Sequence, residues 1–88
     1  GLEQAGRRPA LVLSHKPYNQ RTGLAIVCPM TSRTDKPWPF LVPLNESSAV
    51  IADQVKCVDW RGRRAQPKGK VDPAVLQTVL TLITRIIM

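Results

Sequence analysis

The sequence contains few residues that could form a metal or redox centre. Its 88 residues include two cysteines and one histidine, and no CxxC pair or Cys/His cluster has the spacing of a metal site. No apolar run approaches the roughly 20 residues that a membrane-spanning helix needs, and no charged-then-apolar signal segment opens the chain. A glycine-rich phosphate loop and a Ser/His/Asp set are also missing. Hydrolysis by a metal or by a catalytic triad is therefore disfavoured.

Chain length and net charge further limit the class of protein and the kind of partner that the sequence allows. Residues 1–88 are expected to form one domain with a small core, to which dimerisation would add. With 43% apolar and 22% charged residues, the composition is typical of a compact globular protein. Thirteen Lys and Arg against six Asp and Glu give a net charge of +7, which favours a polyanionic partner: nucleic acid, an acidic protein or a membrane surface. Cys28 and Cys57 lie in apolar, strand-like runs and are predicted to be buried free thiols in a reducing cytosol.

Alternating apolar and polar runs predict several short strands. The expected strands are residues 9–14, 24–29 and 38–44, followed by one strand, or two broken near Asp53, within residues 49–60. Prolines restrict the strand over residues 38–44 to an edge or a bend, because proline cannot donate to the ladder. The expected loops are residues 1–8, 15–23, 30–37 and 61–70, the last of which is basic.

One helix is predicted, from about Pro73 to Met88. Asp72 suits the N-cap, and Pro73 suits the first helical position, where its missing N–H costs nothing. Apolar residues then recur at helical spacing: Val75, Leu76, Val79, Leu80, Ile83, Ile86 and Ile87. Since no helix separates successive strands, the pattern favours a mainly β, α+β fold in which a small barrel carries a C-terminal helix.

The first nine residues gather groups that can interact with a phosphate. Gly1-Leu-Glu-Gln-Ala-Gly-Arg-Arg-Pro9 contains a carboxylate, an amide and two guanidinium groups, and the adjoining strand could hold them rigidly. Taken by composition alone, a solvated basic loop is the favoured alternative. The single histidine, His15, lies in a polar stretch, where a surface role is favoured over a catalytic one.

Four segments, in order, resemble those of MazF/PemK (Kid) toxins. Residues 1–9 are similar to the family's G-x-E-Q-x-G-x-R-P loop, and Pro29-Met-Thr-Ser32 is similar to its P-x-T-S loop. Ile51-Ala-Asp-Gln-Val55 resembles the D-Q segment, and Trp60-Arg-Gly-Arg63 resembles the basic turn before the final helix. Because their order and spacing match over nearly the whole chain, the sequence is identified as a member of this family.

The resemblance implies the toxin of a type II toxin-antitoxin system on an SH3-like barrel of the CcdB/MazF/Kid type. Such a toxin is a metal-independent, cofactor-free endoribonuclease of the bacterial cytoplasm. It cuts single-stranded RNA by 2′-hydroxyl attack, leaving a 2′,3′-cyclic phosphate and a 5′-hydroxyl, and so inhibits translation and growth. The implied partners are the RNA, a second copy in a homodimer, and an acidic MazE/PemI-like antitoxin whose disordered tail folds on the basic surface. Family members have a further strand before the Glu-Gln loop, so the first strand is expected to be missing upstream of residue 1.

The resemblance also carries catalytic roles onto matching positions. Cleavage without a metal needs a base for the 2′-hydroxyl proton, a cation for the charge on the phosphorus oxygens and a donor for the leaving oxygen. Arg8 is the candidate cation, Thr31 is the candidate hydrogen-bond donor to the scissile phosphate, and Glu3 could act as the base or orient Arg8. Asp53 is a secondary catalytic candidate, because relatives that use this aspartate carry an arginine at the position of Ile51.

Residues for RNA binding are predicted around these groups. The candidates are Gln4, Arg7, Ser32, Arg33, Lys56, Arg61, Arg63 and Arg64. Basic side chains from Arg61 to Lys70 can neutralise phosphates, and a solvated turn is the alternative. Trp38 and Trp60 could stack on bases, although packing in the core or in a dimer is the commoner role of tryptophan. Residues 16–22 and 32–36 are expected to read bases. The alternative functions are a non-catalytic, nucleic-acid-binding SH3-like module and an inactive toxin remnant.

Overall fold

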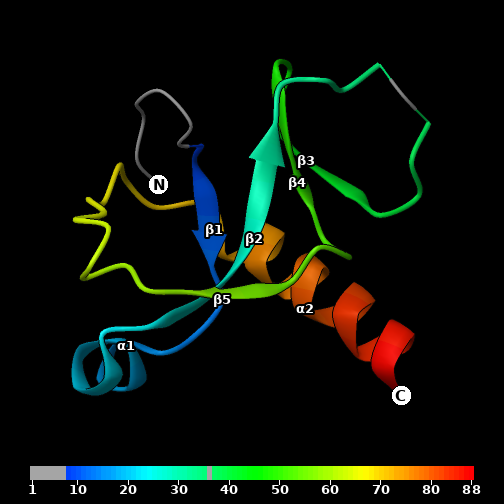
Figure 1. Cartoon of the computed structure of the whole chain (residues 1–88). Helices are drawn as coiled ribbons and strands as arrows, with labels where there is room; N and C mark the ends of the chain where they lie inside the picture. Colours follow the sequence, from blue (N-terminus) through cyan, green and yellow to red (C-terminus); the bar gives the residue numbers. More distant parts are fainter. Residues whose placement is uncertain (1–7, 36) are drawn as a thin grey trace.

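The computed structural model describes residues 8–35 and 37–88, whose arrangement is shown in Figure 1. Its elements are β1 (Ala10–Val12), α1 (Lys16–Thr22), β2 (Ala25–Thr31), β3 (Leu41–Asn45), β4 (Ser48–Ile51), β5 (Lys56–Val58) and α2 (Pro73–Ile87). The prediction of a mainly β chain that ends in a helix is confirmed. Among these residues, no helix has the length and apolar character needed to cross a membrane.

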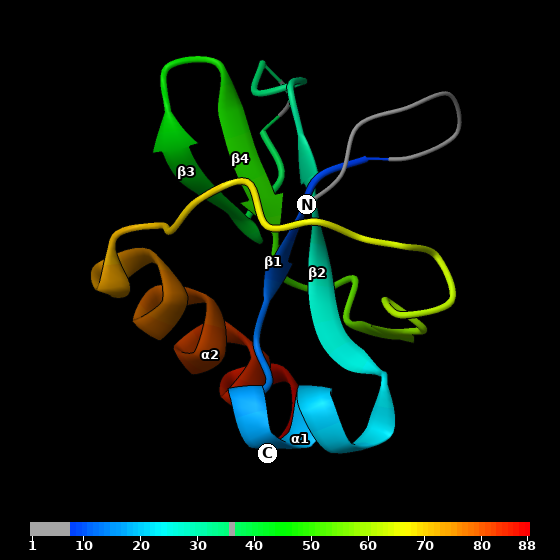
Figure 2. The same cartoon turned by 90° about the vertical axis from the view of Figure 1, so that its left-hand side faces the viewer.

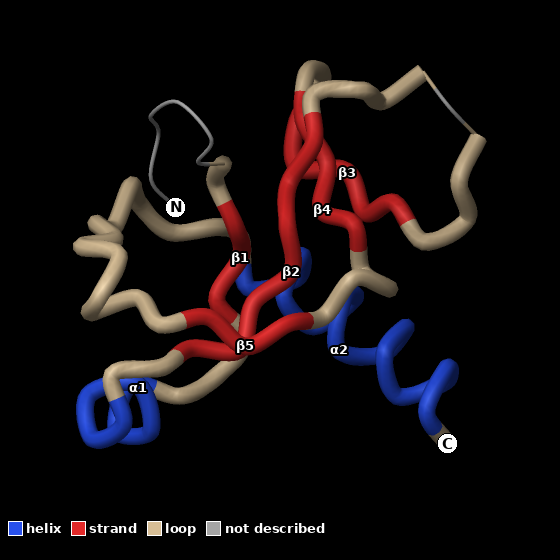
Figure 3. Tube along the Cα trace, in the orientation of Figure 1, coloured by secondary structure: helices blue, strands red, loops and turns tan. Residues whose placement is uncertain are grey.

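The central strand of the sheet is β2, and every strand pair is antiparallel (Figure 3). On one edge of β2, residues 27–29 pair with β1. On the opposite edge, residues 25–27 pair with β5 and residues 30–31 pair with β4, which in turn pairs with β3. Within the described ranges, β1 and β3 remain at the ends of the strand order. The sheet therefore has the predicted antiparallel character but does not close into a barrel there.

Two predictions about the strands are confirmed. The proline-containing strand, β3, lies at the end of the strand order, and Pro43 sits where its register with β4 shifts, as expected of a residue that cannot donate to the ladder. The stretch from Ala49 to Trp60 forms two strands, β4 and β5, separated by a turn that contains Asp53. By contrast, the loop expected from Met30 begins two residues later, because Met30 and Thr31 extend β2 by pairing with β4.

The loop predicted over residues 15–23 contains α1, and that prediction is wrong. Pro17 lies in the first turn of this helix, and Gly23 ends it with a φ of 73°, its N–H donating to the carbonyl of Asn19 at 3.0 Å. The Asn19 side chain also exchanges hydrogen bonds with Ser14. Since α1 has no buried residue, its sequence lacks the apolar periodicity that identifies a helix.

The terminal helix α2 packs along one face of the sheet (Figure 2). As predicted, Asp72 caps it: Asp72 Oδ1 accepts the Ala74 N–H at 2.9 Å. Four strands, the turn after β4 and α2 contribute to the main core cluster, which consists of Leu11, Cys28, Val42, Val50, Ala52 and Val79. The last turn extends beyond this core, since Ile86 is 50% exposed and Ile87 is 74% exposed.

The two cysteines differ in their surroundings. Cys28 is fully buried, as predicted, and its Sγ lies 3.6 Å from the Ala52 carbonyl oxygen. Burial raises the pKa of the Cys28 thiol above its ordinary value of 9.0, and the negative charge of Asp53 raises it further. Cys57 is exposed on β5, so the prediction that it is buried is wrong. Its apolar neighbours indicated a strand correctly, but the strand is short and its side chain lies outside the core cluster.

Candidate functional site

The antiparallel register of β1 and β2 brings two of the predicted catalytic residues together. Ala10 is the partner of Pro29, and the N–H of Met30 donates to the Pro9 carbonyl at 3.1 Å. Continuing this pairing by one more residue on each strand places Arg8 opposite Thr31. The pairing of β1 with β2 therefore brings together two residues that are far apart in the sequence.

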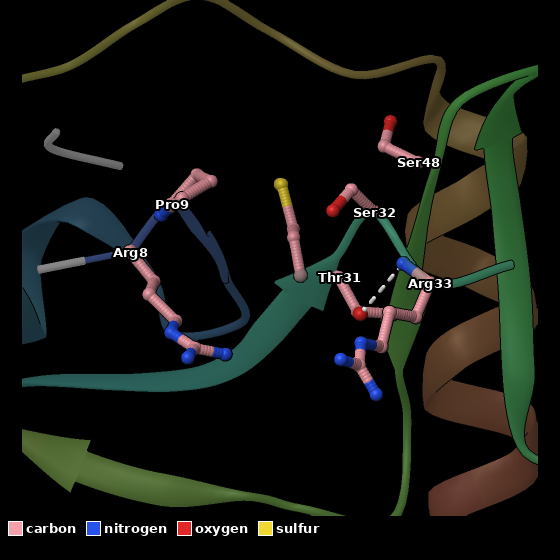
Figure 4. A pocket seen from close by; sticks show the side chains of 7 residues that line it. Arg8, Pro9, Thr31, Ser32, Arg33 and Ser48 are labelled. Atoms are coloured by element: carbon pink, nitrogen blue, oxygen red, sulfur yellow. Dashed lines mark hydrogen bonds between the residues drawn. The ribbon is translucent and has the colours of Figure 1, made fainter.

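A pocket of about 440 Å³ lies at this end of the sheet. It is lined by Arg8, Pro9, Met30, Thr31, Ser32, Arg33 and Ser48. In Figure 4, Arg8 stands on one side, beside the start of β1, while Thr31, Ser32 and Arg33 stand on the other, at the end of β2. Ser48 comes from the first residue of β4, the strand that pairs with β2 at Thr31. Three chain segments thus supply one concave site.

The Thr31 hydroxyl is positioned by the backbone two residues further along the chain. Its Oγ1 accepts the Arg33 N–H at 3.0 Å, the dashed line in Figure 4, which is a local turn of the kind that Ser and Thr form. Because that bond uses a lone pair of the oxygen, the hydroxyl hydrogen can still be donated to a bound group. The position of the Thr31 oxygen is therefore restrained before any ligand arrives.

The lining of the pocket suits an anion with several oxygen atoms. Arg8 and Arg33 bring two guanidinium groups, which offer forked donors to phosphate oxygens, and Thr31, Ser32 and Ser48 bring hydroxyls. Met30 and Pro9 supply apolar surface between them. Both arginines are exposed, so an entering phosphodiester could reach them without rearrangement of the core.

The remaining basic candidates lie away from this pocket. Lys56 belongs to β5, which pairs with residues 25–27 at the other end of β2, and Arg61, Arg63 and Arg64 follow in an exposed turn. Arg61 is engaged within the protein: its guanidinium donates to the Gln20 carbonyl and lies 5.1 Å from the centre of the Trp60 ring. The structure therefore separates the basic turn from the pocket residues.

Trp60 has a packing role in this turn. Its Nε1–H donates to the Asn19 carbonyl at 3.0 Å, and its side chain is partly buried. Together with the Arg61 contact, this bond satisfies carbonyls at the C-terminal end of α1. Of the two interpretations of Trp60, packing is the one its contacts support.

Asp53 and Trp38 contact each other outside the pocket lining. The Trp38 Nε1–H donates to Asp53 Oδ1 at 3.1 Å, and Trp38 is 49% exposed. Its ring meets Phe40 edge to face, with centroids 5.8 Å apart. The secondary catalytic candidate is thus held by an indole rather than placed beside Arg8 and Thr31.

Three candidates fall outside the described residues, namely Glu3, Gln4 and Arg7. His15 is exposed just before α1 and does not line the pocket. Sequence reasoning missed Met30 and Ser48, whose place depends on the pairing of β2 with β4. In residues 8–35 and 37–88, no three His, Cys, Asp or Glu side chains group in a way that could hold a metal ion.

Fold and pocket together define a small basic antiparallel-sheet protein with a pocket, lined by two arginines and several hydroxyls, at one end of its central strand. Residues 1–87 match the family of PemK-like, MazF-like toxins of type II toxin-antitoxin systems. The chain is 43% identical over 90 residues to the endoribonuclease toxin MazF of Escherichia coli K12, and the alignment covers 99% of this chain and 80% of that protein. The endoribonuclease MazF of Escherichia coli O157:H7 matches to the same extent.

Solved structures agree with this assignment. A MazE-MazF structure from Deinococcus radiodurans superposes with a TM-score of 0.88 at 42% identity, covering 96% of this chain and 85% of that one. MazF from the same organism superposes with a TM-score of 0.82 at 43% identity, covering 99% and 82%. The chain belongs to the PemK-like, MazF-like toxin family of type II toxin-antitoxin systems. The family and the fold class predicted from the sequence are confirmed.

Proposed function

We propose that this toxin cuts single-stranded RNA in the pocket at the end of β2, without a metal ion. The observation that carries the proposal is the placement of Arg8 and Thr31 in one pocket by the strand register. Relatives at 43% identity are named endoribonucleases, which supports the same class of reaction here. The pocket's two guanidinium groups and its hydroxyls provide the donors that a phosphodiester would need.

The reaction would proceed by attack of the RNA's own 2′-hydroxyl on the adjacent phosphorus. A base removes the 2′-hydroxyl proton, the 2′-oxygen bonds to phosphorus, and the 5′-oxygen leaves with a proton. The products are a 2′,3′-cyclic phosphate and a 5′-hydroxyl. Arg8 would stabilise the charge that develops on the phosphorus oxygens, while the Thr31 hydroxyl would donate to one of them. Glu3 is the proposed base, or it orients Arg8, as the family resemblance implies.

RNA contacts beyond the scissile phosphate are proposed for two groups of residues. Ser32 and Arg33 line the pocket itself, so they would bind the neighbouring backbone. Lys56, Arg63 and Arg64 are exposed in and after β5 and would bind phosphates further along the strand. Gln4 and Arg7 would add contacts from the segment before Arg8. Arg61, already bound to α1, would act mainly through that contact.

The proposed partners follow from family and charge. Since the Deinococcus radiodurans neighbours include MazE-MazF complexes and this chain carries a net charge of +7, we propose an acidic antitoxin that covers the basic surface and blocks RNA. A homodimer in the bacterial cytoplasm is the proposed working form. Growth arrest would then result from RNA cutting in the absence of the antitoxin.

The test is cleavage of a long single-stranded RNA by the purified protein in excess EDTA, with chemical mapping of the ends. We expect cutting that survives EDTA and leaves cyclic or 3′-phosphate ends and 5′-hydroxyls. A matched RNA with a single 2′-deoxy nucleotide at a mapped site should remain intact at that site alone. If the protein binds RNA but leaves it whole, the proposal fails and the non-catalytic binding module or the inactive remnant replaces it. Cutting at the deoxy site would refute attack by the 2′-hydroxyl.

A further inference from the structure

The hairpin that joins β3 to β4 contains a β-bulge close to the pocket. Pro43 is the partner of Ala49, whereas the next pair joins Asn45 to Ser48. Leu44 is therefore an extra residue in β3, and its side chain packs against the core. In a regular ladder Leu44 would lie opposite Ser48, but the bulge brings the polar Asn45 to that position. Because directly opposite residues share a face of the sheet, the Asn45 side chain lies beside that of Ser48.

The Asn45 side chain engages the hydroxyl hydrogen of Ser48. Asn45 Oδ1 accepts the Ser47 N–H at 2.8 Å, and it accepts the hydroxyls of Ser47 and Ser48 at 3.1 Å each. A backbone N–H can only donate, which identifies this Asn45 atom as the oxygen of the amide. An amide oxygen can only accept, so the hydrogen in the bond to Ser48 comes from the serine. What Ser48 Oγ offers to a ligand is therefore its lone pairs.

The other side of the pocket carries hydrogen-bond donors. The guanidinium groups of Arg8 and Arg33 can only donate, and the Thr31 hydroxyl, which accepts the Arg33 N–H, has a hydrogen left to donate. In Figure 4 these three groups lie toward one side, whereas the Ser48 hydroxyl lies apart from them on the opposite side. The pocket thus has a donor side and, at Ser48, an acceptor side.

The pocket is larger than a phosphate requires. Its volume of about 440 Å³ lies in the range of roughly 300 to 1,000 Å³ that is typical of sites for drug-sized molecules. Pro9 and Met30 give part of the lining an apolar character. A phosphodiester is an anion without a hydrogen to donate, so it suits the donor side and leaves Ser48 Oγ without a partner. The donors of RNA are base N–H groups and ribose 2′-hydroxyls, so the acceptor side suits a nucleoside.

We propose that the Ser48 side of the pocket is a nucleoside subsite for the RNA. There Ser48 Oγ accepts a hydrogen bond from a nucleotide beside the scissile phosphate, either from a base N–H or from the 2′-hydroxyl that does not attack. Asn45 is the positioning residue that keeps the Ser48 hydrogen turned away from the RNA. The inference rests on the proposed RNA cutting and adds a substrate-binding residue to it. Since Arg8 and Thr31 act on the phosphate, Ser48 affects KM rather than kcat.

The experiment compares the cutting of a defined RNA by the wild type, Ser48→Ala, Ser48→Thr and Ser47→Ala. Ser48→Ala removes the acceptor and should raise KM about five- to tenfold, with kcat changed less than about threefold. Threonine keeps a hydroxyl and suits a strand, so Ser48→Thr should stay within about threefold of the wild type. Ser47→Ala is the matched control, because Ser47 Oγ donates to the same Asn45 oxygen at the same distance but does not line the pocket. This control should leave KM unchanged.

Substrate analogues identify the donor. One arm removes the amino group of the base on either side of the mapped site, or methylates N3 where the base is uracil. The other arm removes the 2′-hydroxyl of the nucleotide that does not supply the attacking oxygen. One of these changes should raise the wild-type KM about five- to tenfold and leave that of Ser48→Ala unchanged, because both remove the same hydrogen bond. Asn45→Ala frees the Ser48 hydrogen and should reduce the discrimination against that analogue to about threefold or less.

Three results would overturn the inference. An unchanged KM in Ser48→Ala would remove the subsite. A rise in KM that is equal for every RNA and every analogue would make Ser48 a general contact to the backbone. A rise in Ser47→Ala as large as that in Ser48→Ala would trace the effect to the order of the turn. If the wild type itself cuts no RNA, the proposed function fails separately. The dissociation constants of an RNA selected by binding, and of its analogues, for the same variants then decide whether the subsite exists.

Discussion

Replacing Thr31 by valine should reduce RNA cutting sharply while leaving the fold intact. Valine has nearly the shape of threonine, and a β-branched residue suits the end of β2. The change removes the hydroxyl that lies in the pocket and accepts the Arg33 N–H. Only chemistry and local loop order are therefore altered, which makes the variant informative.

The expected effect of Thr31→Val on RNA cutting has two parts. Loss of one donor to the charge that develops in a transition state lowers kcat by roughly 100- to 1,000-fold. Loss of the Arg33 N–H acceptor adds little, because that N–H is at an exposed position and water can replace the bond at a net cost of about 1 kcal/mol or less. The first effect acts on kcat and the second on the order of the loop. We therefore expect kcat to fall with KM changed only a few-fold.

Single-turnover cleavage of a defined RNA in EDTA measures this directly, and Thr31→Ser is the matched control. Serine retains an oxygen that can accept from Arg33 and donate to phosphate, so it should remain within about tenfold of the wild type. Unfolding curves of both variants check that the fold is retained. A valine variant that cuts within fivefold of the wild type would refute the role of the hydroxyl, as would a serine variant that fails equally.

Further predictions concern the core, the helix cap and the thiols. Val79→Ala should lower the free energy of unfolding by about 2 to 3 kcal/mol in urea titrations, since Val79 is fully buried between α2 and the sheet. Asp72→Ala should cost about 1 kcal/mol, through loss of the cap on Ala74. A thiol reagent should modify Cys57 in the native protein and Cys28 only after unfolding. The pKa of the Cys28 thiol is raised in the folded state. The free energy of unfolding should therefore fall as the pH rises above about 9, because the unfolded chain then releases the Cys28 proton more readily than the folded protein does. Cys28→Ala should remove this part of the loss of stability at high pH.

Local signals identified some elements and missed others for physical reasons. The Asp72-Pro73 start and the apolar stripe of α2 predicted that helix closely, because capping chemistry and core packing both act there. The helix α1 escaped prediction because it buries no side chain. What holds α1 is distant in sequence: the Trp60 indole and the Arg61 guanidinium bind its last carbonyls. Tertiary contacts of this kind leave no periodic pattern.

The site was predictable only in part. Motif resemblance selected Arg8 and Thr31 as partners, and the antiparallel register supplies the reason that they meet. Ser48 could not be found in this way, because its approach depends on the pairing of β4 with the end of β2. Asp53 matched a catalytic position in relatives, but its side chain contacts an indole outside the pocket. The direction of the Asp53 side chain is set by the turn after β4. The sequence motif alone does not reveal the geometry of that turn.

The most direct test of the central claim is the single-turnover rate of RNA cutting by wild type and Arg8→Ala at saturating protein, in EDTA. Arg8 is exposed two residues before β1, so its truncation should leave the fold and most of the RNA affinity unchanged. The account predicts a fall of about 1,000-fold in the cutting rate, because the cation that stabilises charge on the phosphorus oxygens is lost. A rate within a few-fold of the wild type, with the fold intact, would contradict the assignment of the chemistry to this pocket.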